Sequence, residues 1–191
     1  MPEPDLVTQA LARNLKRLRL ERGHTLDALA ARSGVSRGMV VQIEQGRTNP
    51  SIGTVARLAD ALGASIARLL DYDATSAVRI VPAEDAVRLW TGPGGGSGTL
   101  LGGAEAPGPL ELWTWRLHPG ESHASDPHPP GTYEIARVDE GALTLTLDGR
   151  DHRVPAGSTA SYEAAAAHGY RNDGDAPCRF TLVVSVPPPG R

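Results

Sequence analysis

The spacing of apolar residues changes along this 191-residue chain, and the change divides the sequence into two parts. In residues 5–72, Leu11, Leu15 and Leu18 recur at intervals of three and four positions, which is the spacing of one helix face. From about Val78, glycine and proline become frequent, and short runs alternate between apolar and polar residues as strands do. Three such runs cover residues 110–117, 142–149 and 179–186. The sequence therefore predicts an α + β protein of two domains, the first helical and the second a β-sandwich or barrel.

Residues that begin and end helices predict a bundle of five short helices in the first part. Thr25, Ser36 and Ser51 can cap helix N-termini, and Gly46 and Gly63 can end helices. The last four helices are expected over about 25–31, 36–45, 51–62 and 65–70. We expect a helical domain over 1–72, a linker over 73–84 and a β domain over 85–188, with a flexible loop at 91–99 inside the β domain.

Charge and cysteine content limit the partners and the cellular compartment that the protein can have. Residues 1–72 hold ten Arg and Lys against seven Asp and Glu, whereas the remainder holds nine against fifteen. This asymmetry suggests different partners for the two parts. Cys178 is the one cysteine and cannot form an internal disulfide, which fits a reducing cytoplasm. Basic residues interrupt any secretory apolar segment near the N-terminus, and no run approaches membrane-spanning length, so a cytoplasmic protein without membrane contact is expected.

The stretch "TLDALAARSGVSRGMVVQIEQGRTNPS", residues 25–51, carries the strongest motif. Ala30 is small where two helices nearly touch, and Gly34 stands at a turn where positive φ favours glycine. Glu44, Gly46 and Pro50 follow the second helix at fixed spacing. Leu29, Val35, Val40 and Ile43 are spaced to fill a small core. Together these positions resemble the helix-turn-helix of the Xre/phage-repressor family.

The resemblance implies that the second helix of this motif enters the major groove of DNA. Arg37 can make two hydrogen bonds to guanine and Gln42 to adenine, so these two are the expected base readers. Gly38 would keep the helix close to the DNA, and Val41 could contact a thymine methyl group. The remaining candidates for DNA contact are Thr25, Ser36, Gln45, Arg47 and Asn49. An ordinary solvated helix face is the alternative, and the joint occurrence of turn, small residue and core pattern disfavours it.

The β part contains "HASDPHPPGTYE", residues 123–134, and a second histidine-containing pattern farther along. The first pattern is Gly120, His128, Glu134 and Gly141, and the second is Gly149, Pro155, Gly157, His168 and Asn172. Residues 85–188 thereby resemble the cupins, small β-barrels of the jelly-roll type. The combination of an Xre-type module with one cupin resembles bacterial regulators whose cupin senses a small molecule.

The cupin resemblance implies a metal site at His128, Glu134 and His168. Two histidines and a carboxylate suit one divalent transition metal, such as Fe, Zn, Ni or Mn. Asp126 stands where the family has another histidine, and five residues separate His128 from Glu134, which is more than the usual three or four. A displaced ligand weakens a metal site, so a barrel without metal is slightly favoured. His123 and His118 fall outside the pattern, and we expect His123 to be a solvated loop residue.

Aromatic residues of the β part suggest a pocket for an effector. Its expected residues are His128, Tyr133, Glu134, Tyr162, His168 and Tyr170. Trp113 and Trp115 share one strand face, and we expect them in barrel packing or a dimer interface rather than in the pocket. By the same alternation, Glu134 points opposite to Tyr133.

Two functions follow from these patterns. The first, which we favour, is a non-enzymatic, homodimeric transcriptional regulator. Its helices would bind a two-fold operator in double-stranded DNA, and its cupin would pair the subunits and bind a small-molecule effector. The alternative is a non-haem iron-dependent oxygenase or epoxidase of the helix-turn-helix plus cupin type. The long spacing from His128 to Glu134 and the well-kept recognition helix count against the enzyme.

Overall fold

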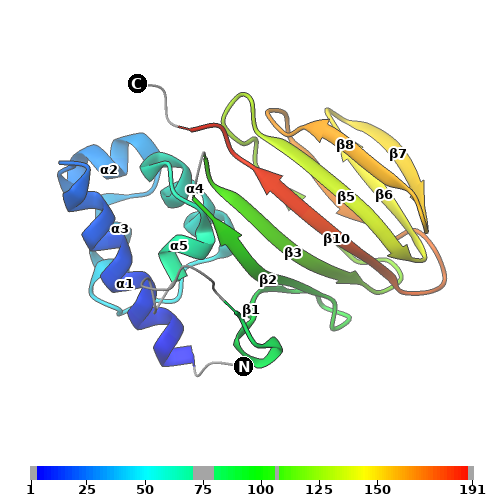
Figure 1. Ribbon diagram of the computed structural model, residues 1–191, viewed down its shortest axis with the longest axis horizontal. Helices are drawn as coiled ribbons and strands as arrows, with labels where there is room; N and C mark the ends of the chain where they lie inside the picture. Colours follow the sequence, from blue (N-terminus) through cyan, green and yellow to red (C-terminus); the bar gives the residue numbers. More distant parts are fainter. Residues whose placement is uncertain (1–3, 71–79, 106–107, 189–191) are drawn as a thin grey trace.

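The computed structural model describes residues 4–70, 80–105 and 108–188 and places five α-helices before the strands (Figure 1). The helices are α1 (Pro4–Glu21), α2 (Leu26–Ser33), α3 (Arg37–Glu44), α4 (Ile52–Leu62) and α5 (Ile66–Leu70). The predicted helical bundle is confirmed, with helix boundaries within two residues of those expected from α2 onward. The predicted linker at 73–84 falls mostly outside the described residues, and its last residues enter the short 3₁₀ helix η1 (Ala83–Asp85).

Side-chain caps explain where three of the helices begin, and glycines explain where two of them end. Thr25, Ser36 and Ser51 each accept a hydrogen bond from a backbone amide of the helix that follows. Gly34 and Gly63 end α2 and α4 with φ of 65° and 54°, in the left-handed region that favours glycine. The caps expected from the sequence are therefore those that the protein uses.

The second part is a barrel of two antiparallel sheets (Figure 1). One sheet has the order β1-β2-β3-β10-β5-β8 and the other β4-β9-β6-β7. The strands are β1 (Val87–Thr91), β2 (Ser97–Ala104), β3 (Leu110–Leu117), β4 (Ser122–Ser125), β5 (Tyr133–Glu140), β6 (Ala142–Leu147), β7 (Arg150–Pro155), β8 (Thr159–Glu163), β9 (His168–Arg171) and β10 (Cys178–Ser185). Inward-facing residues of β3, β5 and β10 alternate with exposed ones, which confirms the predicted barrel.

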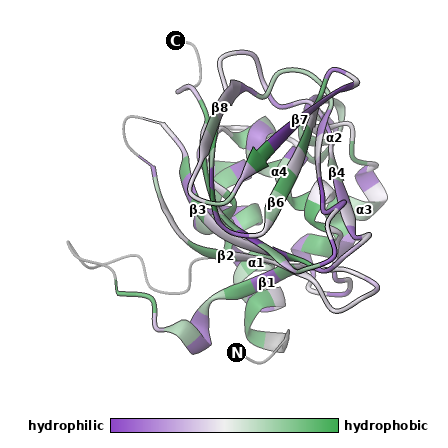
Figure 2. Ribbon diagram, turned by 90° about the vertical axis from the view of Figure 1, so that its right-hand side faces the viewer, coloured by the Kyte–Doolittle hydropathy of each residue, from purple (hydrophilic) through white to green (hydrophobic). Residues whose placement is uncertain are grey.

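The helices lie against one end of the barrel, and Figure 2 shows them behind it when the barrel is viewed from its other end. The short helix α5 packs on β2, and its residues Ile66 and Ala67 are buried. Buried residues of the helices and of the barrel belong to one hydrophobic cluster. One end of the barrel is therefore closed by the helical part.

The glycine-rich segment 91–99 lies inside the β part, where β1 turns into β2. The buried Glu121 carboxylate accepts hydrogen bonds from the amides of Gly94, Gly96 and His118. The segment expected to be a flexible loop is thus a hairpin turn anchored by a carboxylate. Among the described residues, no helix combines the length and apolar character needed to cross a membrane.

Candidate functional site

The α3 helix and the segments that flank it expose most of the residues predicted to contact DNA. Of the nine, only Val41 is half-buried, and the other eight are exposed. Arg37 Nε lies 3.1 Å from Asp27 Oδ1 of α2, and both side chains are exposed. Exposed ion pairs contribute little stability, so Arg37 can exchange Asp27 for a base edge at small cost.

Glu44, known from the sequence only as part of the motif, has a structural role. Its carboxylate receives hydrogen bonds from Arg19 of α1, with Nε–Oε1 at 2.6 Å and Nη2–Oε2 at 2.9 Å. Arg19 also donates to the carbonyl oxygen of His24 over 3.0 Å. The two side chains are only 10% and 8% exposed. This nearly buried, two-point ion pair joins α1 to the end of the recognition helix α3.

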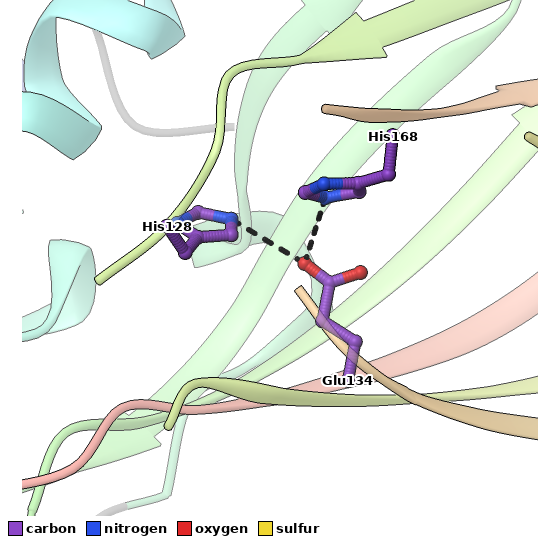
Figure 3. Close-up of side chains that lie close together, drawn as sticks. All are labelled: His128, Glu134 and His168. Carbon is purple, nitrogen blue, oxygen red and sulfur yellow. Dashed lines mark ion pairs between the residues drawn. The ribbon is translucent and has the colours of Figure 1, made fainter. Parts of the chain in front are cut away.

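His128, Glu134 and His168 come together inside the barrel, and Figure 3 shows their side chains pointing toward one another. His128 lies in the loop before β5, Glu134 lies on β5, and His168 begins β9. Glu134 Oε1 is 3.4 Å from His128 Nε2 and 3.3 Å from His168 Nε2. One ligand atom from each residue lies within 4.8 Å of the others. The three predicted ligands are therefore brought together.

Neighbouring groups orient His168 and Glu134 so that their ligand atoms point toward one another. His168 Nδ1 contacts the carbonyl oxygen of Ala166 at 2.9 Å, which fixes this nitrogen as the donor and turns Nε2 toward Glu134 Oε1. Tyr162 and Tyr170 both donate to Glu134 Oε2, the oxygen that faces away from the histidines. Among the described residues, the buried Nε2 of His168 has no hydrogen-bond partner.

The electrostatics of the cluster favour a charged carboxylate. Burial opposes ionisation of Glu134, but contacts from His128, His168 and Tyr162 hold its pKa well below the usual range. Burial also disfavours the charged form of His128, yet Asp60 and Glu134 raise the pKa of its ring to about 10. Burial and the Glu134 charge raise the pKa of the Tyr162 and Tyr170 hydroxyls, so both remain hydrogen-bond donors.

The residues present fit a divalent transition metal. Two imidazole nitrogens and one carboxylate oxygen form a ligand set that leaves coordination positions open. The orphaned Nε2 of His168 and the carbonyl contact behind it are the arrangement expected of a metal ligand. The long spacing from His128 to Glu134 does not separate them, because residues 129–132 form a turn and the His128 amide donates to the carbonyl oxygen of Ala164. This turn keeps His128 beside Glu134 in spite of the longer spacing.

A cavity of about 390 Å³ lies between the cluster and the helical part. This volume is within the range of small-molecule sites. Its barrel wall includes Trp90, Trp113, Trp115, His123, His128, Glu134 and Tyr170. Its other wall is formed by Ser51, Ile52, Gly53, Ala56, Arg57, Asp60 and Ile66. A molecule bound in this cavity would touch both the barrel and the helices.

Polar contacts join α4 and α5 to the barrel around this cavity. Arg57 Nη1 donates to Asp126 Oδ2 over 3.0 Å, and Asp60 Oδ2 lies 3.8 Å from His128 Nδ1. Glu111 accepts hydrogen bonds from the Ile66 amide and from the indole of Trp113. Burial raises the pKa of Glu111 to about 7 in spite of these two hydrogen bonds.

Three expectations about individual residues are wrong. Tyr133 is 55% exposed on the outer face of its sheet, because alternation along β5 points only Glu134 inward. Trp113 and Trp115 do pack inside the barrel, as one of the two expected alternatives had it, and they also form part of the cavity wall. His123 is not a solvated loop residue, since it lies on β4 with its ring centroid 4.8 Å from that of Trp115. Tyr162 and His168 contact Glu134, which lines the cavity, but they do not line the cavity themselves.

Sequence patterns did not indicate the helical wall of the cavity. Arg57 and Asp60 belong to a helix predicted for its apolar face alone, and Glu111 sits in an alternating strand. Glu111 could have been noticed, because it is a charged residue at an inward position of the alternating strand β3. Burial of an unpaired carboxylate is costly, so such a position indicates that the carboxylate has partners inside the protein. No comparable signal marks Arg57 or Asp60, whose partners lie 69 and 68 positions away along the chain.

Comparison with known proteins agrees with both parts of the fold. A helix-turn-helix family model matches residues 15–69, and a cupin domain model matches residues 113–185. The HTH-type transcriptional regulator SutR of Escherichia coli K12 is 26% identical over 178 residues, which are 93% of this chain and 95% of SutR. An uncharacterized HTH-type transcriptional regulator of Sinorhizobium fredii, y4dJ, is 44% identical over 57 residues, 30% of this chain and 74% of that protein.

A solved structure shares the whole architecture. The crystal structure of an HTH_3 family transcriptional regulator from Vibrio cholerae superposes with a TM-score of 0.74 at 28% identity, covering 96% of this chain and 99% of that one. The similarity therefore extends over the helices and the barrel together. These proteins are described as transcriptional regulators, which favours the regulator over the oxygenase considered from the sequence.

Proposed function

Because this chain belongs to the helix-turn-helix family of DNA-binding transcriptional regulators and carries a cupin domain, we propose that its barrel senses a small molecule and reports it to the DNA-binding helices. The observation that carries this proposal is the cavity whose two walls come from the barrel and from α4 with Ile66. A ligand can shift regulation only by binding one arrangement of the domains better than another. We place the DNA-binding domain at residues 1–72 and the sensing domain at 85–188, joined by 73–84.

The cavity suggests the chemistry of the effector. All three tryptophans of the chain line it, so an apolar or aromatic body would be favoured. Two buried donors in its wall, Arg57 Nε and Trp115 Nε1, have no hydrogen-bond partner among the described residues. An unpaired buried donor is costly, so an occupant that offers an acceptor atom would bind favourably there.

In the DNA complex we assign base reading to Arg37 and Gln42, with Gly38 and Val41 lying against the base edges. The exposed side chains around them are assigned to backbone or peripheral contacts. These are Thr25, Ser36, Gln45, Arg47 and Asn49.

The double variant Arg37→Ala with Gln42→Ala tests this assignment. We expect it to lose roughly 30-fold or more in DNA affinity, since each good bidentate base contact contributes about 1–3 kcal/mol. The measurement is fluorescence anisotropy at fixed salt with the DNA upstream of the protein's own gene. Arg150→Ala, which removes an exposed positive charge from β7, serves as the charge control and should bind almost normally. Unchanged binding by the double variant would contradict the assignment.

We also propose that two copies pair through the outer face of the six-stranded sheet. Four of the exposed large apolar side chains lie there. They are Leu110 and Leu112 on β3 and Tyr133 and Ile135 on β5. Val183 of β10 is the register partner of both Leu112 and Ile135, so these side chains form a row across three strands. A two-fold dimer covers such a face and presents two recognition helices to a two-fold operator.

The dimer is tested by replacing Leu112 and Ile135 together with arginine. Placing four like charges in the two-fold interface should give a monomer by light scattering, while the wild type should have twice that mass. Leu20→Arg changes an exposed leucine of α1 instead and should leave the mass unaltered. A wild-type protein that is monomeric at all concentrations, or a double variant of unchanged mass, would contradict this interface.

Finally, we propose one divalent transition metal, Fe, Zn, Ni or Mn, held by His128, Glu134 and His168. The convergence of the three ligand atoms and the orphaned Nε2 of His168 support it. A metal here would supply a Lewis acid at the inner end of the cavity, where an acceptor atom of the effector could reach it.

A further inference from the structure

Asp60 is a residue of the DNA-binding helices that faces the metal-binding cluster of the barrel. It lies on α4, and its Oδ2 is 3.8 Å from Nδ1 of His128. The other nitrogen of the same ring, Nε2, faces Glu134 Oε1 at 3.4 Å. The two sides of the His128 ring therefore face different domains, with the cluster on one side and α4 on the other.

Histidines that ligate metals usually direct their second ring nitrogen to a carboxylate or a carbonyl oxygen, which orients the ring and raises its basicity. His168 has such a partner within the barrel, the carbonyl oxygen of Ala166. The corresponding group for His128 is the carboxylate of Asp60, contributed by the helical part. At 3.8 Å this contact is an ion pair, and a small movement of α4 would shorten it to a hydrogen bond or separate the two groups.

A second contact joins α4 to the same loop. Arg57, one turn earlier on α4, donates to Asp126 of the segment that leads to His128. The side chains of Asp60 and His128 are 23% and 19% exposed, whereas those of Arg57 and Asp126 are 42% and 72% exposed. The pair that includes Asp60 is thus the more protected, and α4 contacts the His128 loop at two points.

We propose that Asp60 positions His128 for metal binding, so that occupation of the metal site and docking of α4 onto the barrel stabilise each other. The inference rests on the proposed metal site and adds its regulation. Coupling between two such events is reciprocal. A metal in the barrel would favour the docked helices, and any state in which α4 leaves the barrel, including one selected by DNA, would bind the metal more weakly.

The test is a zinc titration of the metal-free full-length protein in competition with a chromophoric chelator. Asp60→Asn keeps the shape of the side chain but removes the charge, and we expect zinc affinity to fall by about 10- to 100-fold. Asp126→Asn is the matched control, because it removes a carboxylate from the same domain contact without touching His128, and its affinity should stay close to wild type. Asp60→Glu restores a carboxylate and should recover part of the loss.

Hydrogen exchange provides a second measurement that a merely structural role would not change. Zinc should slow exchange of the amides of α4 and α5 in the wild type and in Asp126→Asn, but much less in Asp60→Asn. Equal zinc affinity and equal zinc-dependent protection in Asp60→Asn and wild type would overturn the inference while leaving the metal site intact. A wild type that binds none of Zn(II), Fe(II), Ni(II) or Mn(II) would overturn the metal site and the inference together.

Discussion

Replacing Glu44 with alanine is expected to destabilise the helical part by about 3–5 kcal/mol. The change leaves the guanidinium of Arg19, which is only 10% exposed, without the carboxylate that binds it at two points. Removing one partner of a buried pair is costly because the other charge stays desolvated and uncompensated. Since the pair joins α1 to the end of α3, the recognition helix should also lose DNA affinity.

Two signals separate this effect from a general loss of stability. All three tryptophans lie in the barrel, so their fluorescence reports unfolding of the barrel, whereas the helical circular dichroism signal reports the first part. Glu44→Ala should shift the helical transition in urea more than the fluorescence transition. Glu21→Ala is the matched control, because its exposed pair with Arg17 contributes only about 0.3–0.5 kcal/mol. Similar shifts for the two variants would show that the Arg19–Glu44 pair does not stabilise the helices.

Local patterns predicted the parts of this molecule that local chemistry determines. Caps such as Thr25 and Ser36 act on amides three residues away, so their effect is visible in a short stretch of sequence. The same holds for Gly34, where a turn with positive φ requires little information beyond the glycine itself. The helix-turn-helix and its exposed face follow from such local rules.

Contacts between distant segments could not be predicted in this way. Arg57 with Asp126 and Asp60 with His128 depend on how the helices dock on the barrel, which no spacing within either segment encodes. The cluster of His128, Glu134 and His168 was found in the sequence only because the cupin resemblance supplied the long-range pairing of His128 with His168. Tyr133 shows the opposite case, since strand alternation already implied that it and Glu134 could not both face the barrel interior.

A turn accommodates the extra residues between His128 and Glu134, which the spacing alone did not indicate. Pro129 accepts a hydrogen bond from the Thr132 amide, so the additional residues form a compact turn between His128 and β5. Asp126, which stands where the family has a further histidine, faces Arg57 of α4 instead of the cluster. The position that departs from the family motif is thus used for contact between the domains.

His168→Ala is expected to abolish the proposed metal binding and has the largest predicted effect on the cupin domain. Loss of an outer partner of a metal ligand costs about 10- to 100-fold in affinity, so loss of the ligand itself should cost more than about 100-fold. Anaerobic Fe(II) titration followed by metal analysis should give one bound equivalent for the wild type and none for the variant at the same concentration.

His123→Ala is the appropriate control for this variant. His123 also lines the cavity and packs against Trp115, but it lies outside the ligand set, so its loss should perturb tryptophan fluorescence without changing metal stoichiometry. If His168→Ala retained one equivalent of Fe(II) with wild-type affinity, the assignment of His168 would fail. Loss of metal from both histidine variants would instead indicate that the barrel interior had unfolded, which the fluorescence transition in urea would reveal independently.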